Sequence, residues 1–522
     1  MALKYTEIGE IKKKINRAKQ SFTKRQFELA QLKNGQKEDL RFRISQLNKL
    51  YYALKDNEEE IVLAMQKDFN RTPFESVCLE LVPLYGDLLK LIEILPDLIK
   101  DEKIKESSPI FGLSKVKLQR IALGTVLVIS PSNFPVNLAM NPIAGAIAGG
   151  NTVVWKPSEL TPETGIVLER ILKNCLEPGL VEVVQGAVPE TSALLKSDSF
   201  DKIFYTGSTT VGSIVAQEAA KSLTPCVLEL GGKSPVFITE NLSQDKLRKA
   251  LRRTFFSSFA SAGQVCVASD FVLVHESQYD AAVKISKEVL QEMWPDFNDK
   301  TDFTHMITQR GYEKTRETLD STRGKKFDTC VPGYRGEDRV IPPTLVFDVE
   351  WNDPLMKNEN FAPVMPFVKY HNLDDAIDLV LKDHDYPLAL YIFSTDNQEI
   401  DHIMRRIRSG GCMIGDTMIH VSAKDAPFGG IRRSGYGNYH GKWTVHAFTH
   451  ERTVIYQPYF TEKIAKLLGP PFGNKKLGIM RLAAEPKPKL GRDGKTLWKA
   501  KLFIQFALIG VALSLLVKNV IL

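Results

Sequence analysis

Residues 121–159 read IALGTVLVISPSNFPVNLAMNPIAGAIAGGNTVVWKPSE, and this stretch decides the fold class. The β-branched run 121–130 predicts a strand that ends in a Pro-Ser-Asn-Phe-Pro turn, and residues 141–148 predict a helix. Two glycines then lead into a second strand at 152–155. A strand, a helix and a strand in this order are typical of a β-α-β unit with parallel strands.

The same alternation continues along the chain. Repeated β-α-β connections predict a doubly wound parallel sheet, whose ligands bind beyond the carboxyl ends of the strands. A second strand-and-helix series predicts a further α/β domain. The first series continues with a helix from Pro162 to Asn174, strands at 181–184, 203–205 and 226–230 and a helix at 211–221, and the second contains strands at 271–274, 342–346 and 388–393 and a helix at 279–293, with Thr161 as the expected N-cap of the first helix.

Polar residues and glycines gather at the predicted strand ends. A helix that opens behind Gly207 and Ser208 could direct its N-H groups at a pyrophosphate, with Gly207 and Gly212 allowing close backbone approach, although such glycines more often mark simple turns. Cys266 lies in a Gly-marked turn, where a nearby helix start would favour its thiolate, although a lone Cys is more often a small buried apolar group. The other strand-end candidates are Asn133, Lys156, Glu159 and Glu229.

The composition excludes several classes of protein. The 522 residues include 69 Lys and Arg against 62 Asp and Glu, a mild net charge of +7 without a long basic stripe, so nucleic acid is not an expected partner. The six cysteines show no paired C-x-x-C spacing, and no H-E-x-x-H accompanies the histidines near His446. We therefore expect no metal site and no disulfide framework.

The two ends of the chain differ. Residues 10–105 have helical periodicity and no apolar signal segment, whereas residues 502–517 are apolar apart from Gln505 and Ser514. These 16 residues would span roughly 24 Å as a helix, against a hydrocarbon core of roughly 30 Å, and extension to Leu522 makes them long enough to cross it. A buried amphipathic helix is disfavoured, because apolar residues occur all round the segment.

The chain resembles the aldehyde dehydrogenases from about residue 10 to residue 460. Within that family it is similar to the class 3 branch, which includes membrane-bound fatty aldehyde dehydrogenases. It departs from the family pattern at Ser132, where Trp is usual, and at Ala362, where Gly is usual. The stretches that carry the resemblance are 132–135 (SNFP), 156–159 (KPSE), 205–208 (YTGS), 228–235 (LELGGKSP), 263–266 (GQVC), 359–361 (ENF) and 427–430 (PFGG), with 387–391, 439–442 and 448–450 for the class 3 branch.

The resemblance implies oxidation of long-chain aldehydes to carboxylic acids with NAD, or with NADP as the other option, and it allows other hydrophobic or aromatic aldehydes as substrates. It implies that Cys266 is the nucleophile, that Asn133 stabilises the oxyanion and that Glu229 activates the hydrolytic water. It places Lys156 and Glu159 at the ribose, Gly207, Ser208 and Gly212 at the pyrophosphate, and Glu359 and Phe361 at the nicotinamide.

The predicted organisation is an NAD-binding domain (1–110 and 124–230), a catalytic domain (231–425), a bridging element that forms a homodimer (111–123 and 426–460), a linker (461–501) and a C-terminal membrane anchor (502–522). We expect the enzyme to face the cytosol, on the mitochondrial outer membrane in preference to the endoplasmic reticulum or lipid droplets. Two alternatives remain open. One is a relative that transfers the acyl group to coenzyme A, and the other is a membrane-tethered binding protein without catalysis.

Overall fold

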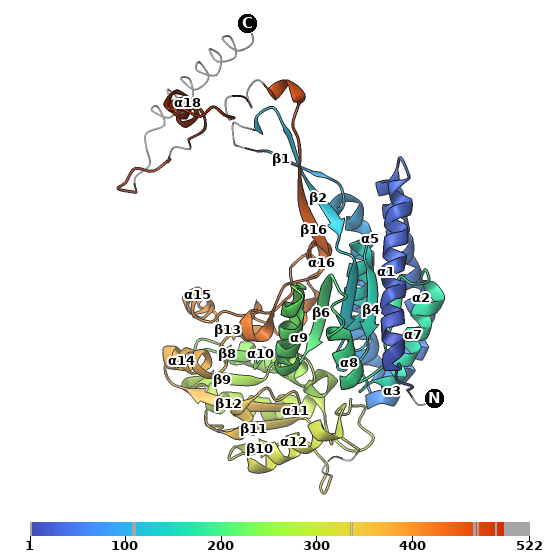
Figure 1. The fold of residues 1–522 in the computed structure, drawn as a ribbon. Coiled ribbons are helices and arrows are strands. Elements are labelled where there is room, and N and C mark those ends of the chain that lie inside the picture. The colour runs from blue at the N-terminus through green and yellow to red at the C-terminus, as the bar shows by residue number, and fades with distance from the viewer. Residues whose placement is uncertain are drawn as a thin grey trace. The chain divides into compact units, whose positions relative to one another are not determined.

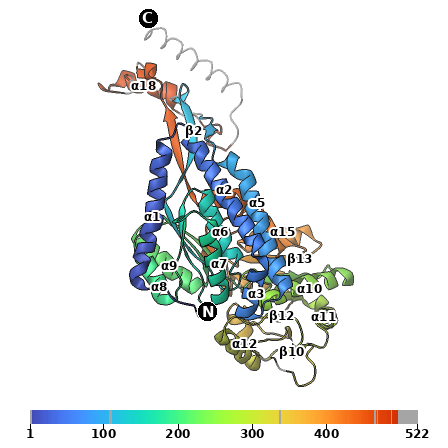
Figure 2. The same ribbon diagram turned by 90° about the vertical axis from the view of Figure 1, so that its right-hand side faces the viewer.

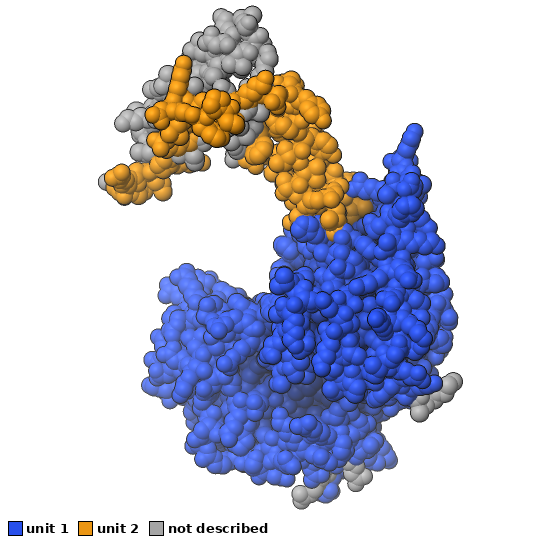
Figure 3. All heavy atoms as spheres, viewed as in Figure 1, with its two compact units in different colours: residues 1–98, 122–450 blue, residues 99–121, 451–522 orange. Residues whose placement is uncertain are grey.

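The computed structural model describes residues 3–106, 111–334, 336, 338–462, 466, 469–485 and 488–494. The chain divides into two compact units, which Figure 3 colours separately. Unit 1 contains residues 1–98 and 122–450, and unit 2 contains residues 99–121 and 451–522.

The described helices and strands alternate over much of the chain, as the parallel-sheet prediction requires (Figure 1). The helices are α1 (Ile8–Ala30), α2 (Gly35–Asp56), α3 (Glu58–Phe69), α4 (Pro73–Glu75), α5 (Val82–Leu98), α6 (Asn137–Ala148), α7 (Pro162–Cys175), α8 (Val188–Leu195), α9 (Thr209–Lys221), α10 (Gln244–Phe259), α11 (Glu276–Met293), α12 (Gln309–Ser321), α13 (Pro354–Lys357), α14 (Leu373–Asp383), α15 (Asn397–Arg406), α16 (Gly441–Ala447) and α18 (Asn474–Ala484). The strands are β1 (Glu102–Ile104), β2 (Lys115–Ala122), β3 (Thr125–Ile129), β4 (Thr152–Lys156), β5 (Val181–Val183), β6 (Lys202–Gly207), β7 (Cys226–Leu230), β8 (Pro235–Ile238), β9 (Phe271–His275), β10 (Lys325–Phe327), β11 (Thr344–Phe347), β12 (Val364–Tyr370), β13 (Ala389–Phe393), β14 (Gly411–Ile414), β15 (Gly435–Tyr436) and β16 (Thr449–Tyr456).

One sheet of unit 1 has the strand order β15-β7-β6-β3-β4-β5 among the described residues. All its neighbouring strands are parallel except β15, which is antiparallel to β7. Every residue of β3 and β4 is buried, because helices cover the sheet and leave no solvent face for polar side chains. Figure 2 shows the helical side of this unit, where α2 packs against α5 and α7.

The strand order reverses next to β3. The chain runs from β3 through β4 to β5 on one side, and then returns to β6 and β7 on the other side. In open α/β sheets a crevice for ligands forms outside the carboxyl ends of the strands at such a reversal. The topology therefore places the candidate residues that follow β3 and β6 at one crevice.

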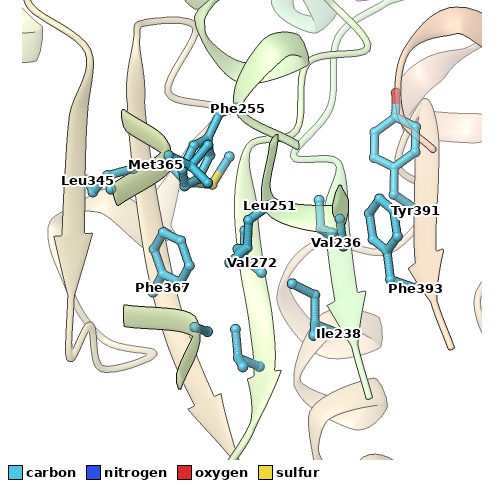
Figure 4. Close-up of a cluster of buried hydrophobic side chains, with 14 of the residues drawn as sticks. Val236, Ile238, Leu251, Phe255, Val272, Leu345, Met365, Phe367, Tyr391 and Phe393 are labelled. Atoms are coloured by element: carbon cyan, nitrogen blue, oxygen red, sulfur yellow. The ribbon is translucent and has the colours of Figure 1, made fainter. Parts of the chain in front are cut away.

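A second sheet in unit 1 has the order β10-β11-β12-β9-β8-β13-β14, with only the β10–β11 pair antiparallel within the described chain. Its core contains aromatic and β-branched side chains from the strands and from α10 (Figure 4). Phe367 contacts both Phe347 and Phe255, with ring centroids 5.0 and 6.3 Å apart. The predicted second α/β domain is thus a parallel sheet with its own core.

Unit 2 contains a three-stranded sheet of order β1-β2-β16, in which β1 and β2 are antiparallel. Residues 461–501, predicted to be a linker, include the helix α18. None of the helices in the described ranges is long and apolar enough to cross a membrane. The predicted anchor, residues 502–522, lies outside the described residues.

Several predicted boundaries are wrong. The run 121–130 is two strands, because Gly124 has φ +145° and a Cβ there would come within 2.1 Å of the Asp201 carboxylate. Residues 102–104, predicted to be helical, form β1 through pairing with β2. Thr161 makes no capping bond to α7, and Asp68 instead accepts the backbone N-H groups of Glu163 and Thr164 at 3.0 and 2.9 Å.

Candidate active site

A cleft of about 630 Å³ lies at the carboxyl ends of the first sheet, and we call it the strand-end cleft. It joins residues that are far apart in the sequence, because parallel strands end at one edge of a sheet. Nine of the ten predicted site residues line it: Asn133, Lys156, Glu159, Gly207, Ser208, Glu229, Cys266, Glu359 and Phe361.

Gly212 is the exception, and its role at the pyrophosphate stays a prediction. It does not line the strand-end cleft, and a Cβ at this position would come within 2.5 Å of the Leu230 side chain. Gly212 therefore allows α9 to pack closely on β7. Close packing of a helix on a strand is enough to explain a glycine at this position.

The end of β6 and the start of α9 line the strand-end cleft through Gly207, Ser208 and Val211. Ser208 is the N-cap, and its hydroxyl accepts the N-H of Val211 at 3.4 Å. The N-terminus of a helix favours anions, because its first N-H groups lack partners within the helix and the helix dipole is positive there. This end of the cleft suits a phosphate group.

Lys156 and Glu159 form an ion pair at the same cleft, with Nζ and Oε2 2.7 Å apart. Nζ also donates to the backbone oxygen of Pro157 at 2.8 Å. The Lys156 side chain is only 4% exposed, which is unusual for a lysine that has no special role. The pair offers both hydrogen-bond donors and acceptors to a ribose.

Glu359 and Phe361 belong to a constrained loop. Phe361 has φ +47°, a conformation that non-glycine residues rarely adopt and that is concentrated at functional sites. Burial and the nearby charge of Asp270 raise the pKa of Glu359 to about 8, although Gly232 donates a backbone hydrogen bond to it. This carboxyl group is therefore largely protonated at neutral pH.

A buried ion pair, which the sequence did not predict, fixes that loop. Asp270 accepts the backbone N-H of Asn360 at 3.0 Å and its side-chain amide at 2.7 Å. Lys233 pairs with Asp270 and donates to the backbone oxygens of Leu355 and Asn358 at 2.8 and 3.0 Å. Because Asp270 also follows the Cys266 turn by four residues, one network orders both segments.

Cys266 does not lie at a helix start, so the predicted environment for its thiolate is wrong. It lies in a turn that follows α10 and three left-handed residues, Ser261, Ala262 and Gly263. Burial, followed by the charges of Glu359 and Glu229, raises the pKa of the Cys266 thiol to about 12. A thiolate at this position needs a compensating positive charge in the cleft.

Asn133 is positioned beside this turn. Its side-chain amide donates to the backbone oxygen of Gln264 at 2.9 Å. Gln264 in turn donates to the backbone oxygens of Ser261 and His305, both at 3.1 Å, and accepts the N-H of Ile307 at 2.9 Å. These bonds hold an amide donor close to the chain segment that carries Cys266.

Glu229 is 3% exposed, and neither of its carboxylate oxygens has a hydrogen-bond partner among the described residues. Burial raises the pKa of this carboxyl group well above its usual value, as its place in a buried strand predicts. In the antiparallel pair of β15 and β7, Gly435 lies opposite Glu229. Gly435 has φ +118°, and a Cβ there would come within 1.8 Å of the Leu228 oxygen, so only glycine fits.

A second cavity of about 380 Å³ also reaches Cys266, and we call it the apolar pocket. It shares Leu138, Phe428 and Tyr439 with the strand-end cleft. No sequence pattern predicted it, because its walls come from separate helices and loops. Its apolar lining residues are Phe74, Leu79, Pro83, Phe134, Phe256, Val265, Val267, Met418, Ile419 and Val421.

A second unpredicted feature supports the Asn133 loop, and we call it the Arg71–Glu80 clamp. The two side chains are completely buried and form an ion pair of 2.7 Å. Arg71 donates to the backbone oxygen of Asn133 at 2.9 Å, and Glu80 accepts the N-H groups of Val136 and Asn137 at 2.9 and 2.8 Å. Glu80 lies in the π-helix Ser76–Leu81, a form often found at functional sites.

Comparisons with known proteins agree with this geometry. A model of the aldehyde dehydrogenase family matches residues 7–454. The chain is 46% identical to fatty aldehyde dehydrogenase HFD1 of Saccharomyces cerevisiae, over 98% of this chain and 97% of that protein. It is 33% identical to aldehyde dehydrogenase family 3 member A2 of Mus musculus, over 89% and 94% of the two chains.

Among solved structures, the substrate-bound state of AldH from Staphylococcus aureus is similar, with a TM-score of 0.82 and 32% identity. The match covers 90% of this chain and 98% of that chain. It includes most of unit 1, which holds both the strand-end cleft and the apolar pocket.

Proposed function

This chain belongs to the aldehyde dehydrogenase family, and we propose that it oxidises long-chain aldehydes to carboxylates through a covalent intermediate on Cys266. The cofactor is NAD or NADP. The mouse relative is named as a family 3 aldehyde dehydrogenase, the branch that the sequence resembles, and the yeast relative is named for fatty aldehydes.

The observation that Cys266 lines both cavities supports the proposal best. The strand-end cleft offers an ion pair and a helix N-terminus, and the apolar pocket offers aromatic and aliphatic walls. Each methylene group that enters such a pocket from water contributes about 0.8 kcal/mol. A hydrocarbon chain is therefore favoured there, with its aldehyde carbon at the thiol.

The strand-end cleft fits a dinucleotide. Lys156 and Glu159 would hold a ribose, Ser208 and the first turn of α9 a phosphate, and Glu359 with Phe361 the nicotinamide. The buried hydroxyl of Thr206, which also lines the cleft, has no partner among the described residues. When it is bound, the oxidised nicotinamide supplies a positively charged hydride acceptor.

We propose that Cys266 loses its thiol proton to solvent and attacks the aldehyde carbon. A carbon–sulfur bond forms, and the carbonyl electron pair moves to oxygen. The resulting oxyanion accepts hydrogen bonds from the side-chain amide of Asn133 and the backbone N-H of Cys266. Loss of hydride from the same carbon restores the carbonyl group as a thioester.

Glu229 then acts as the base for hydrolysis. Its carboxylate takes a proton from a water molecule, the hydroxide attacks the thioester carbon, and the Cys266 thiolate leaves with the carbon–sulfur electron pair. A buried carboxylate without partners is a strong base, because its raised pKa favours the protonated product. This unpaired group favours transfer of the acyl group to water over transfer to coenzyme A.

Two substitutions test the assignment. Cys266→Ala should abolish aldehyde oxidation, by at least 1,000-fold as an order of magnitude, and leave dinucleotide binding intact. Glu229→Gln should release one equivalent of reduced cofactor and then accumulate acyl-enzyme, because only hydrolysis needs the base. Intact-protein mass after one turnover measures the adduct.

Cys412→Ala provides the control, because Cys412 is exposed and outside both cavities. That variant should turn over normally. Near-normal turnover in Cys266→Ala would refute the mechanism, and loss of hydride transfer without an adduct in Glu229→Gln would assign Glu229 to an earlier step.

We further propose that NAD is preferred over NADP. The Glu159 carboxylate would accept hydrogen bonds from a free 2′-hydroxyl and repel a 2′-phosphate, although Lys156 screens part of its charge. We expect kcat/KM to be about tenfold higher with NAD, and Glu159→Gln to narrow the difference. Equal or better kcat/KM with NADP in the unaltered enzyme would show that Glu159 does not face the ribose.

We also propose that residues 502–522 anchor the enzyme in a membrane, with its catalytic unit in the cytosol and the mitochondrial outer membrane as the site. The apolar run from residue 502 and the lysines on either side of it support this proposal. The proposed homodimer, bridged through residues 111–123 and 426–460, rests on the class 3 resemblance alone.

A further inference from the structure

Two arginines of unit 1, Arg408 and Arg432, converge on one tyrosine, Tyr386, and we call these three residues the Arg–Tyr–Arg cluster. Arg432 donates from Nη1 to the Tyr386 hydroxyl at 3.1 Å, and Arg408 donates from Nη2 to the same oxygen. The guanidinium carbons of Arg408 and Arg432 lie 4.7 and 4.9 Å from the centroid of the tyrosine ring. Tyr386 is only 6% exposed, whereas both arginines are exposed. A buried tyrosine therefore holds two cations together at the surface.

The two cations have no carboxylate partner among the described residues. Neither Arg408 nor Arg432 forms an ion pair there, and the carboxylate of Asp385, the residue before Tyr386, lies beyond ion-pair distance of both. Arg406, two positions before Arg408, shows the ordinary arrangement, because it pairs with two aspartates. Two like charges that are held together without an acid repel each other and attract an anion.

The backbone of the cluster is held in unusual conformations. Tyr386 has φ +63° and Arg432 has φ +51°, left-handed values that non-glycine residues rarely adopt and that are concentrated at functional sites. Ser434 closes the turn that carries Arg432, because its hydroxyl accepts the N-H of Ile431 at 2.9 Å and donates to the Ile431 backbone oxygen at 3.0 Å. The Arg432 side chain therefore projects from a fixed backbone, which lowers the entropic cost of binding a ligand.

The cluster adjoins the strand-end cleft without lining it. The backbone oxygen of Arg433 accepts the hydroxyl of Thr209, the first residue of α9, at 3.3 Å. The turn that carries Arg432 thus contacts the helix N-terminus at which the cleft suits a phosphate group. Neither Tyr386 nor either arginine of the cluster is among the residues that line the strand-end cleft or the apolar pocket, so the cluster is a separate surface.

We propose that the Arg–Tyr–Arg cluster binds a phosphate group. Each guanidinium uses one nitrogen for the Tyr386 hydroxyl and keeps N-H groups on its other nitrogens for a ligand. The planar fork of a guanidinium matches the spacing of two phosphate oxygens, and the bound anion supplies the negative charge that no carboxylate provides. The phosphate belongs either to the dinucleotide as it approaches the neighbouring cleft or to a separate phosphorylated molecule. The proposal does not depend on the role of Cys266.

Thermal unfolding of the full-length protein in the presence of inorganic phosphate tests the proposal. A ligand that binds only the folded state raises the midpoint temperature as its concentration increases. Sodium chloride at equal ionic strength controls for the screening of surface charges. We expect phosphate to raise the midpoint and chloride to leave it almost unchanged.

Arg408→Gln/Arg432→Gln should bind phosphate at least about tenfold more weakly, because it removes both charged donors. Arg408→Lys/Arg432→Lys keeps the charge but not the fork of N-H groups, and its affinity should fall between the two. The matched control Arg310→Gln/Arg405→Gln removes the same charge at exposed positions outside the cluster and should respond to phosphate as the unaltered protein does. Because each variant is compared with and without phosphate, a general loss of stability does not alter the result.

Steady-state kinetics identify the source of the phosphate. If the cluster captures the dinucleotide, Arg408→Gln/Arg432→Gln should raise KM for NAD about tenfold and leave kcat unchanged. If the ligand is a separate molecule, both constants should stay normal, and phosphate should still raise the midpoint at saturating NAD. The proposal would be overturned by a midpoint that phosphate does not raise, by an equal rise with chloride, or by an equal response in the unaltered protein and in Arg408→Gln/Arg432→Gln.

Discussion

Glu229 is a buried group whose proposed function as a base opposes stability. A buried carboxyl group without a hydrogen-bond partner has a folded-state pKa far above its value in the unfolded chain. Above the unfolded pKa of about 4.3, the unfolded chain releases this proton and the folded chain retains it. The free energy of unfolding therefore falls as pH rises through that window and up to the folded-state pKa.

Glu229→Gln should remove this pH dependence, because the amide resembles the protonated acid in shape and carries no charge. We expect the variant to be more stable than the unaltered protein by about 1–3 kcal/mol at pH 8 and nearly equal at pH 4. Urea unfolding followed by circular dichroism across this range measures the difference. Glu59→Gln, at an exposed position, should show no comparable trend, and a Glu229→Gln gain that does not grow with pH would contradict the argument.

For single residues, the sequence predicted which side chains lie close together but not their pKa values. Asn133, Glu229 and Cys266 line one cleft. Their proximity could be predicted because strand ends and turns can be located from local sequence patterns. The raised pKa of Cys266 could not be predicted, since it depends on burial and on Glu359, which is 93 residues away in the sequence. The packing of Gly212 against Leu230 could not be predicted, because a glycine at a ligand and a glycine at a packing contact look alike in sequence.

The Arg71–Glu80 clamp shows how a helical element controls the site. Removal of one partner from a completely buried ion pair leaves an uncompensated charge and typically costs about 3–5 kcal/mol. Arg71 also binds the Asn133 backbone, and Glu80 binds the start of α6. A weakened clamp therefore affects both the fold and the position of Asn133, the proposed oxyanion donor.

Arg71→Met should lower the free energy of unfolding by that amount and reduce kcat by more than it raises KM, because the Asn133 contact matters most for the oxyanion. Urea unfolding and steady-state kinetics measure the two effects. In the matched control Arg17→Met, which breaks a half-exposed pair with Glu182, the loss should be below about 1 kcal/mol and kcat unchanged. Arg71→Met/Glu80→Leu should recover stability without recovering kcat, and joint recovery would mean that the clamp acts only through stability.

The types of the elements in the parallel sheets were predictable because buried strands are continuous apolar runs, whereas apolar residues in the intervening helices recur every three or four positions. The element ends were less predictable. The break at Gly124 depends on the Asp201 side chain, and the capping of α7 depends on Asp68, so both are set by tertiary contacts. The π-helix Ser76–Leu81 has no sequence pattern that separates it from an ordinary helix turn.

For the whole molecule, we predict that catalysis and membrane binding are separable. A chain that ends at Lys489 retains all the described residues of both cavities but lacks the apolar run from residue 502. It should oxidise water-soluble aldehydes at the normal rate and leave membranes in high salt. Its turnover of long-chain aldehydes in bilayers should fall about tenfold or more, because these substrates concentrate in lipid at about 0.8 kcal/mol per methylene group.

Sedimentation with vesicles, together with assays on a short and a long aldehyde, measures this separation. Retention of the shortened chain on membranes in high salt would contradict the anchor. An equal loss on both aldehydes would instead make the C-terminal residues part of the folded enzyme.

For the molecule as a whole, the two-sheet architecture of unit 1 could be predicted from the sequence, whereas the apolar pocket could not. Phe74, Phe256 and Met418 come from three separate regions of the sequence, and each looks like an ordinary core residue there. Only the packed structure shows that these side chains leave a cavity beside Cys266. The proposed substrate class therefore rests on the family resemblance together with this pocket.

The pairing of β15 with β7 also sets the order in which the protein becomes active during its synthesis. A ribosome that has translated residue 400 has already made Asn133, Glu229 and Cys266, but not the strand that pairs with β7 at Gly435. Until that strand emerges, β7 is an unpaired sheet edge that can bind other extended chains. Nascent chains that stop before Gly435 therefore contain the three proposed catalytic side chains and an open edge at β7.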